Sequence, residues 1–292
     1  MKLLMQPKNS PVLKLISNFS KIGLGCHKIQ GGFEYNTSKK IIFSALDNDI
    51  THFDTAPRYG DSEALLGKLL NGIPNISISS KVGLDRLNAP YIGKNLKGLK
   101  RVFKSYLKNN SRKVQSVLDK KMQARYFQTI KELTNIALDV PTEVLTEKQI
   151  RYSLQTTLKN LNRDFLDIYL LHEPDRFINF DEIIFIFNKL KQEGLIGSFG
   201  LGFHRWIDPK QKFINNIVTL SMFHDSMLKN DKSDSNKIVH GALGWYKYRS
   251  TREQREFYGS PIAFIRALTK VNQDSLFLVA PSNNRQLHNF CL

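Results

Sequence analysis

Residues 51–63 read THFDTAPRYGDSE, and this stretch decides the fold we expect. It begins as a short apolar strand that closes at Asp54 and continues into a loop that carries Tyr59. The segment EALLGKLL then opens an amphipathic helix. The pattern places an acid at the carboxyl end of a strand and a phenol in the loop just after it. The plainer alternative is a strand end followed by a turn tyrosine that packs beneath its loop.

Strand and helix patterns alternate along most of the chain. We expect strands over residues 21–25, 50–54, 75–81, 165–171, 195–200, 217–221, 237–240 and 275–279. We expect helices over 37–48, 63–70, 147–161, 180–194, 209–215 and 253–271, with Thr146 and Asn179 as N-caps. Eight strands that alternate with helices predict an α/β fold, a parallel (β/α)8 TIM barrel. The 292 residues suit one such barrel with an insertion, so we expect a single domain over 1–292.

The longest interruption of this alternation runs from about residue 82 to 140, directly after the third strand. It far exceeds an ordinary βα loop, so we interpret it as a folded insertion on the rim of the barrel. Residues 94–125 within it hold eleven Lys or Arg and one acid, of a formal net charge of +17 for the chain. Such a segment suits an anionic ligand, an acidic partner or nucleic acid, or it is simply a solvated basic face.

Composition narrows the class of protein. With 41% hydrophobic and 24% charged residues, the chain is typical of a soluble globular protein. No apolar run is long enough to span a membrane, and the N-terminus lacks the apolar centre of a secretory signal. Two distant cysteines without a paired pattern favour a reducing, cytoplasmic setting. No Cys/His spacing indicates zinc, so we expect no metal.

The opening stretch matches FDTAxxYGxSE at every fixed position, and it therefore resembles the signature of the aldo-keto reductases. Lys81 ends the third expected strand and His172 follows the fourth, so Asp54, Tyr59, Lys81 and His172 fall in the family's order. The resemblance implies a nicotinamide-dependent oxidoreductase that interconverts carbonyls and alcohols. The other histidines that we considered, His27, His52, His204 and His224, have no such support.

These four residue types suit that chemistry. Carbonyl reduction needs a hydride donor, which no side chain provides, and a weak acid that protonates the oxygen. Tyr59 is our candidate acid, and a nearby Lys81 ammonium would lower its pKa. Asp54 would keep Lys81 charged and oriented, and His172 would position the substrate oxygen. Taken singly, each of them is more often a structural residue, and the functional interpretation rests on the ordered set.

The cofactor site departs from the family in part. Gly202 and Phe203 fall where a Ser-Asn pair usually holds the nicotinamide amide, and Ser221 falls where the family has Gln. The C-terminal APSNNRQLHNF resembles GASNxxQLxEN, which marks a phosphate-binding helix start. The matching and nearby residues, together with two cations in the loop that we expect after the seventh strand, are Ser282, Asn283, Arg285, Gln286, Asn289, Lys247 and Arg249. This set favours NADP over NAD, although a capped terminal helix would give the same letters.

Three functions remain open. The first is an NADP-dependent reductase of a small carbonyl substrate, anionic or sugar-like. The second is a relative that keeps the four residues but performs a reaction without net redox change. The third is a non-catalytic barrel that binds acidic partners or nucleic acid through residues 94–125.

Overall fold

The computed structural model describes residues 21–83, 145–172, 178–202, 217–221, 236–248, 250–271, 275–283 and 286–287. The basic segment 94–125 lies outside these residues, and so does the rest of the expected insertion beyond residue 83. The expected helix over 209–215 and the N-terminal segment before residue 21 lie outside them too.

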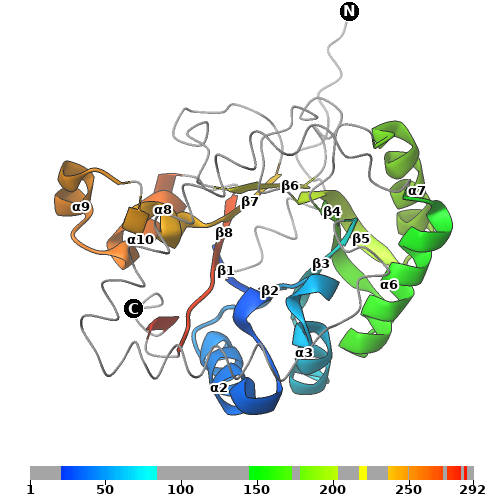
Figure 1. The fold of residues 1–292 in the computed structure, drawn as a ribbon, viewed down its shortest axis with the longest axis horizontal. Coiled ribbons are helices and arrows are strands. Elements are labelled where there is room, and N and C mark those ends of the chain that lie inside the picture. The colour runs from blue at the N-terminus through cyan, green and yellow to red at the C-terminus, as the bar shows by residue number, and fades with distance from the viewer. Residues whose placement is uncertain are drawn as a thin grey trace, which may run out of the picture.

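The described strands form one closed parallel barrel in the order β1 to β8 (Figure 1). Each strand pairs with the next along the chain, and β1 closes the ring against β8. The strands are β1 (Ile22–Gly25), β2 (His52–Asp54), β3 (Ser77–Gly83), β4 (Leu166–His172), β5 (Ile196–Gly202), β6 (Ile217–Ser221), β7 (Asn236–His240) and β8 (Ser275–Val279). The predicted TIM barrel is therefore confirmed.

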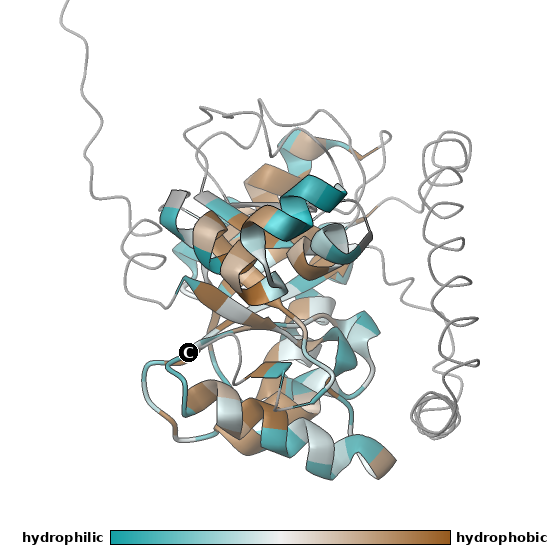
Figure 2. Ribbon diagram, turned by 90° about the vertical axis from the view of Figure 1, so that its left-hand side faces the viewer, coloured by the Kyte–Doolittle hydropathy of each residue, from teal (hydrophilic) through white to brown (hydrophobic). Residues whose placement is uncertain are grey.

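Helices surround the barrel, and short 3-10 turns follow β1 and β2. The helices are α2 (Tyr35–Leu46), α3 (Ser62–Leu70), α6 (Glu147–Leu161), α7 (Phe180–Gln192), α8 (Ala242–Tyr248), α9 (Arg252–Tyr258) and α10 (Pro261–Val271), and the 3-10 turns are η1 (Cys26–Lys28), η2 (Gly32–Glu34) and η3 (Pro57–Tyr59). Figure 2 shows apolar residues along the strands and mixed apolar and polar faces on the helices. The helices α2, α3, α6 and α7 thus bury one face, whereas α9 has no buried residue.

Local signals explain where several helices begin and end. Thr146 accepts a hydrogen bond from the Gln149 amide, and the Gln149 side chain accepts one from the Thr146 amide, which completes the expected capping box. Asn162 ends α6 in the left-handed conformation, at φ 53°. Asn179 caps α7 through the amide of Glu182, as its sequence position indicated.

Two predictions near the C-terminal half need correction. The segment after β7 was expected to be a loop, but it forms α8, because Trp245 is buried and stacks on Phe264 with the ring centroids 5.3 Å apart. The single helix expected over 253–271 is two helices. Gly259 ends α9 at φ 68°, and Ser260 caps the next helix through the amide of Ala263.

The register of the barrel decides which side chains share its interior. Asp54 pairs with Ser79, Lys81 with Leu170 and Gly83 with His172. Paired residues on neighbouring strands point to the same face. Leu170 belongs to an apolar cluster that β4, β7 and β8 share inside the barrel. The polar residues on this register therefore also point inward. A further small correction is that β3 continues through Gly83, so the interruption begins after residue 83 rather than at 82.

Candidate active site

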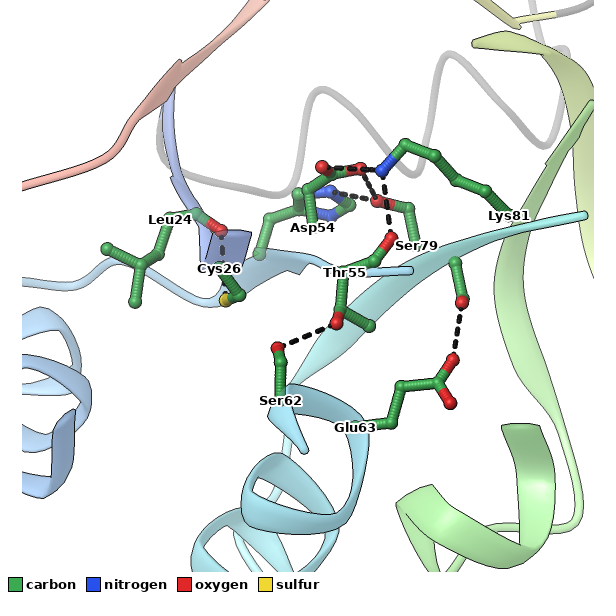
Figure 3. Close-up of polar contacts among 10 residues, drawn as sticks. Leu24, Cys26, Asp54, Thr55, Ser62, Glu63, Ser79 and Lys81 are labelled. Atoms are coloured by element: carbon green, nitrogen blue, oxygen red, sulfur yellow. Dashed lines mark hydrogen bonds and ion pairs between the residues drawn. The ribbon is translucent and has the colours of Figure 1, made fainter. Parts of the chain in front are cut away.

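The centre of the site is an ion pair between β2 and β3. Lys81 Nζ donates to both carboxylate oxygens of Asp54, at 2.8 and 2.7 Å, and to the carbonyl oxygen of Thr55 at 2.8 Å (Figure 3). Ser79 Oγ donates to Asp54 Oδ1 at 2.7 Å. The residues Asp54 and Lys81 are only 4% and 5% exposed. Each of the three ammonium hydrogens of Lys81 can thus donate to an acceptor, and a buried charge needs such hydrogen bonds to offset its desolvation.

The electrostatics of this pair favour its charged form. Burial raises the pKa of Asp54, but the charge and hydrogen bonds of Lys81 and the Ser79 hydroxyl more than offset it, so that the pKa is lowered. Burial likewise lowers the pKa of Lys81, and the Asp54 charge together with Tyr59 reverses this, so that the pKa is raised. Lys81 therefore stays a cation inside the barrel at neutral pH.

Tyr59 lies at the end of η3, with its ring beside the lysine. Lys81 Nζ is 5.0 Å from the centroid of the Tyr59 ring. The Tyr59 carbonyl accepts a hydrogen bond from Gln30 Nε2 at 2.6 Å, which ties the β2 loop to the β1 loop. Burial raises the pKa of Tyr59, and the Lys81 charge lowers it by less, so the net pKa lies above its usual value of 10.0. The Lys81 charge thus lowers the pKa of Tyr59 as expected, but the increase caused by desolvation is larger.

His172 completes the group from the end of β4. Its ring stands edge-on to Tyr59, with the centroids 6.4 Å apart and the planes at 89°. The residue is 8% exposed, and burial with the nearby Lys81 charge lowers the pKa of its imidazole to about 3. Its Nδ1 atom has no hydrogen-bond partner among the described residues. A neutral ring with an uncommitted nitrogen beside a phenol can bind a polar group of a ligand.

A second set of expected residues gathers in the turn after β8. Asn283 Oδ1 accepts from the Gln286 amide at 3.0 Å, and Gln286 Oε1 accepts from the Ser282 amide at 2.8 Å. Lys28, from the loop after β1, donates to the Ala280 carbonyl at 2.8 Å and to Ser282 Oγ at 3.2 Å. Lys28 was not among the predicted site residues, because no pattern in its own loop shows that the turn after β8 lies beside it.

The remaining cofactor candidates are less defined. Lys247 is exposed on α8, and the backbone of Ser221 pairs with His240 at the end of β6. Gly202 ends β5 close to the ion pair, where an added Cβ would lie 3.6 Å from Lys81 Cδ. Arg249, Arg285, Asn289 and Phe203 lie outside the described residues.

Two classes of feature are missing from the part of the chain that the structure describes. There, no group of three or more His, Cys, Asp or Glu residues could hold a metal ion. In the same residues, no helix is long and apolar enough to cross a membrane.

The fold and the site together define a class: a (β/α)8 barrel with an acid, a lysine, a tyrosine and a histidine at the carboxyl ends of its early strands. A sequence model of the aldo/keto reductase family matches residues 21–215, which is more than half of the chain. The chain belongs to the aldo/keto reductase family.

Individual relatives are distant. Aldo-keto reductase YhdN of Bacillus subtilis is 26% identical over 191 residues, which cover 62% of this chain and 43% of that protein. The chain spans about half the length of the curated relatives it matches. An aldo-keto reductase from Bacillus halodurans in its holo form aligns with a TM-score of 0.62 at 18% identity, over 94% of this chain and 86% of that one. An aldo/keto reductase from Klebsiella pneumoniae, in complex with NADP and acetate, aligns with a TM-score of 0.57 at 14% identity, over 94% and 85%. These structural likenesses define the fold.

Proposed function

We propose that the protein is a nicotinamide-dependent oxidoreductase that interconverts a carbonyl and an alcohol. The observation that carries the proposal is the buried Asp54–Lys81 ion pair beside Tyr59 and His172. A buried charge pair of this kind costs desolvation free energy, so its place at the carboxyl ends of the strands favours a chemical role over a stabilising one. Membership of the aldo/keto reductase family supports the same function.

Each of the four residues has a role in this proposal. Tyr59 gives its proton to the substrate oxygen in reduction and takes it back in oxidation. Lys81 stabilises the phenolate, and Asp54 holds the ammonium in place. His172 donates a hydrogen bond to the same oxygen through a neutral imidazole. The nicotinamide supplies or accepts the hydride when it is bound.

The described residues fit such a cofactor. The uncommitted Nδ1 of His172 and the lack of a side chain at Gly202 leave polar capacity and room beside Lys81. Further along the rim, Lys28 and the Ser282 turn bring a cation and a hydroxyl together, which suits a phosphate. Together with Lys28 and Ser282, seven further residues would hold the cofactor: Asn283, Gln286 and Lys247, and, from the sequence pattern, Ser221, Arg249, Arg285 and Asn289. The cations among them favour NADP over NAD.

Fluorescence titration with NADPH and with NADH tests this proposal. We expect NADPH to bind more tightly, and we expect Arg285→Ala to reduce that preference by removing a cation near the 2'-phosphate. Lys270→Ala is the matched control, because Lys270 is an exposed cation on α10. Equal affinities for both nucleotides in the parent protein would contradict the NADP assignment. Absence of binding by either would favour a non-catalytic barrel.

A further inference from the structure

A third buried polar residue, His52, is connected to the ion pair through Ser79. His52 lies on β2 two residues before Asp54 and is 0% exposed. Its Nδ1 atom is 3.1 Å from Ser77 Oγ, and its Nε2 atom is 3.2 Å from Ser79 Oγ. Ser79 Oγ in turn donates to Asp54 Oδ1 at 2.7 Å. A continuous chain of side-chain hydrogen bonds therefore runs through the barrel interior from Ser77 to Lys81.

The chemistry of the groups fixes the direction of this chain. An ionised Asp54 only accepts, so the single hydroxyl proton of Ser79 must point at the carboxylate. Ser79 can then only accept from His52, and the ring proton must sit on Nε2. The pKa of His52 is lowered to about 4, chiefly by burial, so the ring is neutral and its Nδ1 must accept from Ser77. All three hydrogen bonds point toward Asp54.

We propose that Ser79 and His52 are positioning residues that hold the Asp54 carboxylate in the orientation in which it binds Lys81 with both oxygens. Aligned hydrogen bonds strengthen one another in a low-dielectric interior, and here their positive ends face the anion. Without the Ser79 hydroxyl, the bond from Lys81 is the one that Asp54 Oδ1 keeps among the described residues. The carboxylate is then free to turn, and the ammonium beside Tyr59 turns with it.

The strand itself offers a matched control. Ser80 follows Ser79 and is also fully buried, and its hydroxyl donates to Glu63 Oε1 at the same 2.7 Å. Successive residues of a strand point to opposite faces, so Ser80 points away from Ser79, and its hydroxyl binds Glu63 on α3 rather than Asp54. Each change to alanine therefore removes one buried hydroxyl from one carboxylate. Only Ser79→Ala removes a group from the proposed chain.

The first test needs no turnover. In protein labelled with 15N-histidine, two-bond proton–nitrogen correlations report which imidazole nitrogen carries the proton. We expect His52, assigned by the signal lost in His52→Phe, to be the neutral Nε2–H form from about pH 6 upward. An Nδ1–H tautomer or a charged ring in this range would overturn the proposed chain. Because this result is independent of catalysis, it stands apart from any failure of the proposed function.

The second test rests on the proposed function and uses kinetics. We expect Ser79→Ala to lower kcat for carbonyl reduction about tenfold with KM nearly unchanged, and we expect Ser79→Thr, which keeps the hydroxyl, to recover most of it. Ser80→Ala should keep the parent kcat even if it is less stable. Equal losses of kcat in the two alanine variants, or no loss in Ser79→Ala, would overturn the positioning role.

The pH profile separates positioning from a loss of stability. Among the described residues, the titratable groups that face Tyr59 are Asp54 and Lys81 from β2 and β3, Cys26 and His27 from η1, and His172 from β4. In Ser79→Ala, a less well held Lys81 should lower the pKa of Tyr59 by less. Alcohol oxidation should then begin at a higher pH than in the parent, whereas an unchanged profile would contradict the proposal.

Discussion

At the scale of single residues, the site depends on opposing effects of burial. Desolvation raises the pKa of Tyr59, and the positive charge of Lys81 opposes this shift from 5.0 Å above the ring. The lysine remains charged in the same environment only because Asp54 accepts from it with both oxygens. Removal of one partner would leave the other as an unpaired buried charge, which is costly. The acid strength of the phenol therefore depends on groups that need not touch the substrate.

Lys81→Met tests this dependence through pH. In the oxidation direction Tyr59 must be a phenolate, and Lys81 is the group that lowers its pKa. Without that charge the pKa rises further, so the phenolate fraction at any pH below it falls. We expect alcohol oxidation at pH ~9 to lose more rate than carbonyl reduction at pH ~6, where the phenol is fully protonated in both proteins. Equal losses in the two directions would remove Lys81 from control of the phenol.

At the scale of elements, the signature stretch also joins α3 to its neighbours. Glu63 on α3 is 3% exposed and accepts hydrogen bonds from Ser80, Thr157 and Asn160. One turn later, Gly67 lets α6 approach closely, because an added Cβ would meet the carbonyl of Asn160 and lie 2.6 Å from the Leu161 carbonyl carbon. The helix that follows the Tyr59 loop is thereby fixed against both β3 and α6.

In Gly67→Ala, helix propensity and packing against α6 are expected to change the free energy of unfolding in opposite directions. Helix propensity alone predicts that alanine stabilises α3 by about 1 kcal/mol. The close approach of α6 predicts instead a loss of roughly 1–3 kcal/mol in the free energy of unfolding, because the neighbouring atoms are backbone and yield little. Denaturant unfolding measures the sign. Ala64→Lys on the exposed face of the same helix should stay within ~0.5 kcal/mol, and a stabilised Gly67→Ala would disprove the tight packing.

The elements also show which features the sequence could predict. Caps and alternation located the barrel strands and helices to within a few residues, because Thr146 and Asn179 act through their immediate neighbours. The helix α8 was missed because its buried Trp245 packs on Phe264, which is distant in the sequence. The same limit applies to the site. The sequence motif identifies Asp54 and Tyr59 as candidate site residues. His52 and Lys28 become candidates only in the structure, which places them beside β3 and the turn after β8.

At the scale of the whole molecule, the chain carries a large positive charge. The formal net charge is +17, and residues 94–125 contribute eleven cations against one acid. This segment follows β3 in sequence, and Lys81 lies on that strand. A positive field near the site would attract anionic substrates over about a Debye length, ~8 Å at physiological salt. We propose that the segment raises the affinity for such substrates and has little part in the chemical step.

Charge removal tests that proposal. Substitution of Lys97, Lys100, Arg101 and Lys104 by Gln should raise KM for a carboxylated carbonyl substrate several-fold at low salt and flatten its salt dependence, with kcat little changed. An uncharged substrate of similar size is the control and should show no change in KM. If KM for the acidic substrate stays constant while binding to nucleic acid is lost, the segment is a docking surface instead.

The central claim is that Tyr59 is the proton donor of a nicotinamide-dependent carbonyl reduction. The most direct measurement is single-turnover oxidation of bound NADPH by a panel of small carbonyl compounds, followed by the absorbance of the reduced nicotinamide, in the parent protein and in Tyr59→Phe. We expect the parent to turn over and the variant to lose at least ~100-fold in rate, with NADPH affinity nearly intact. A variant that keeps more than about a tenth of the parent rate would contradict the assignment.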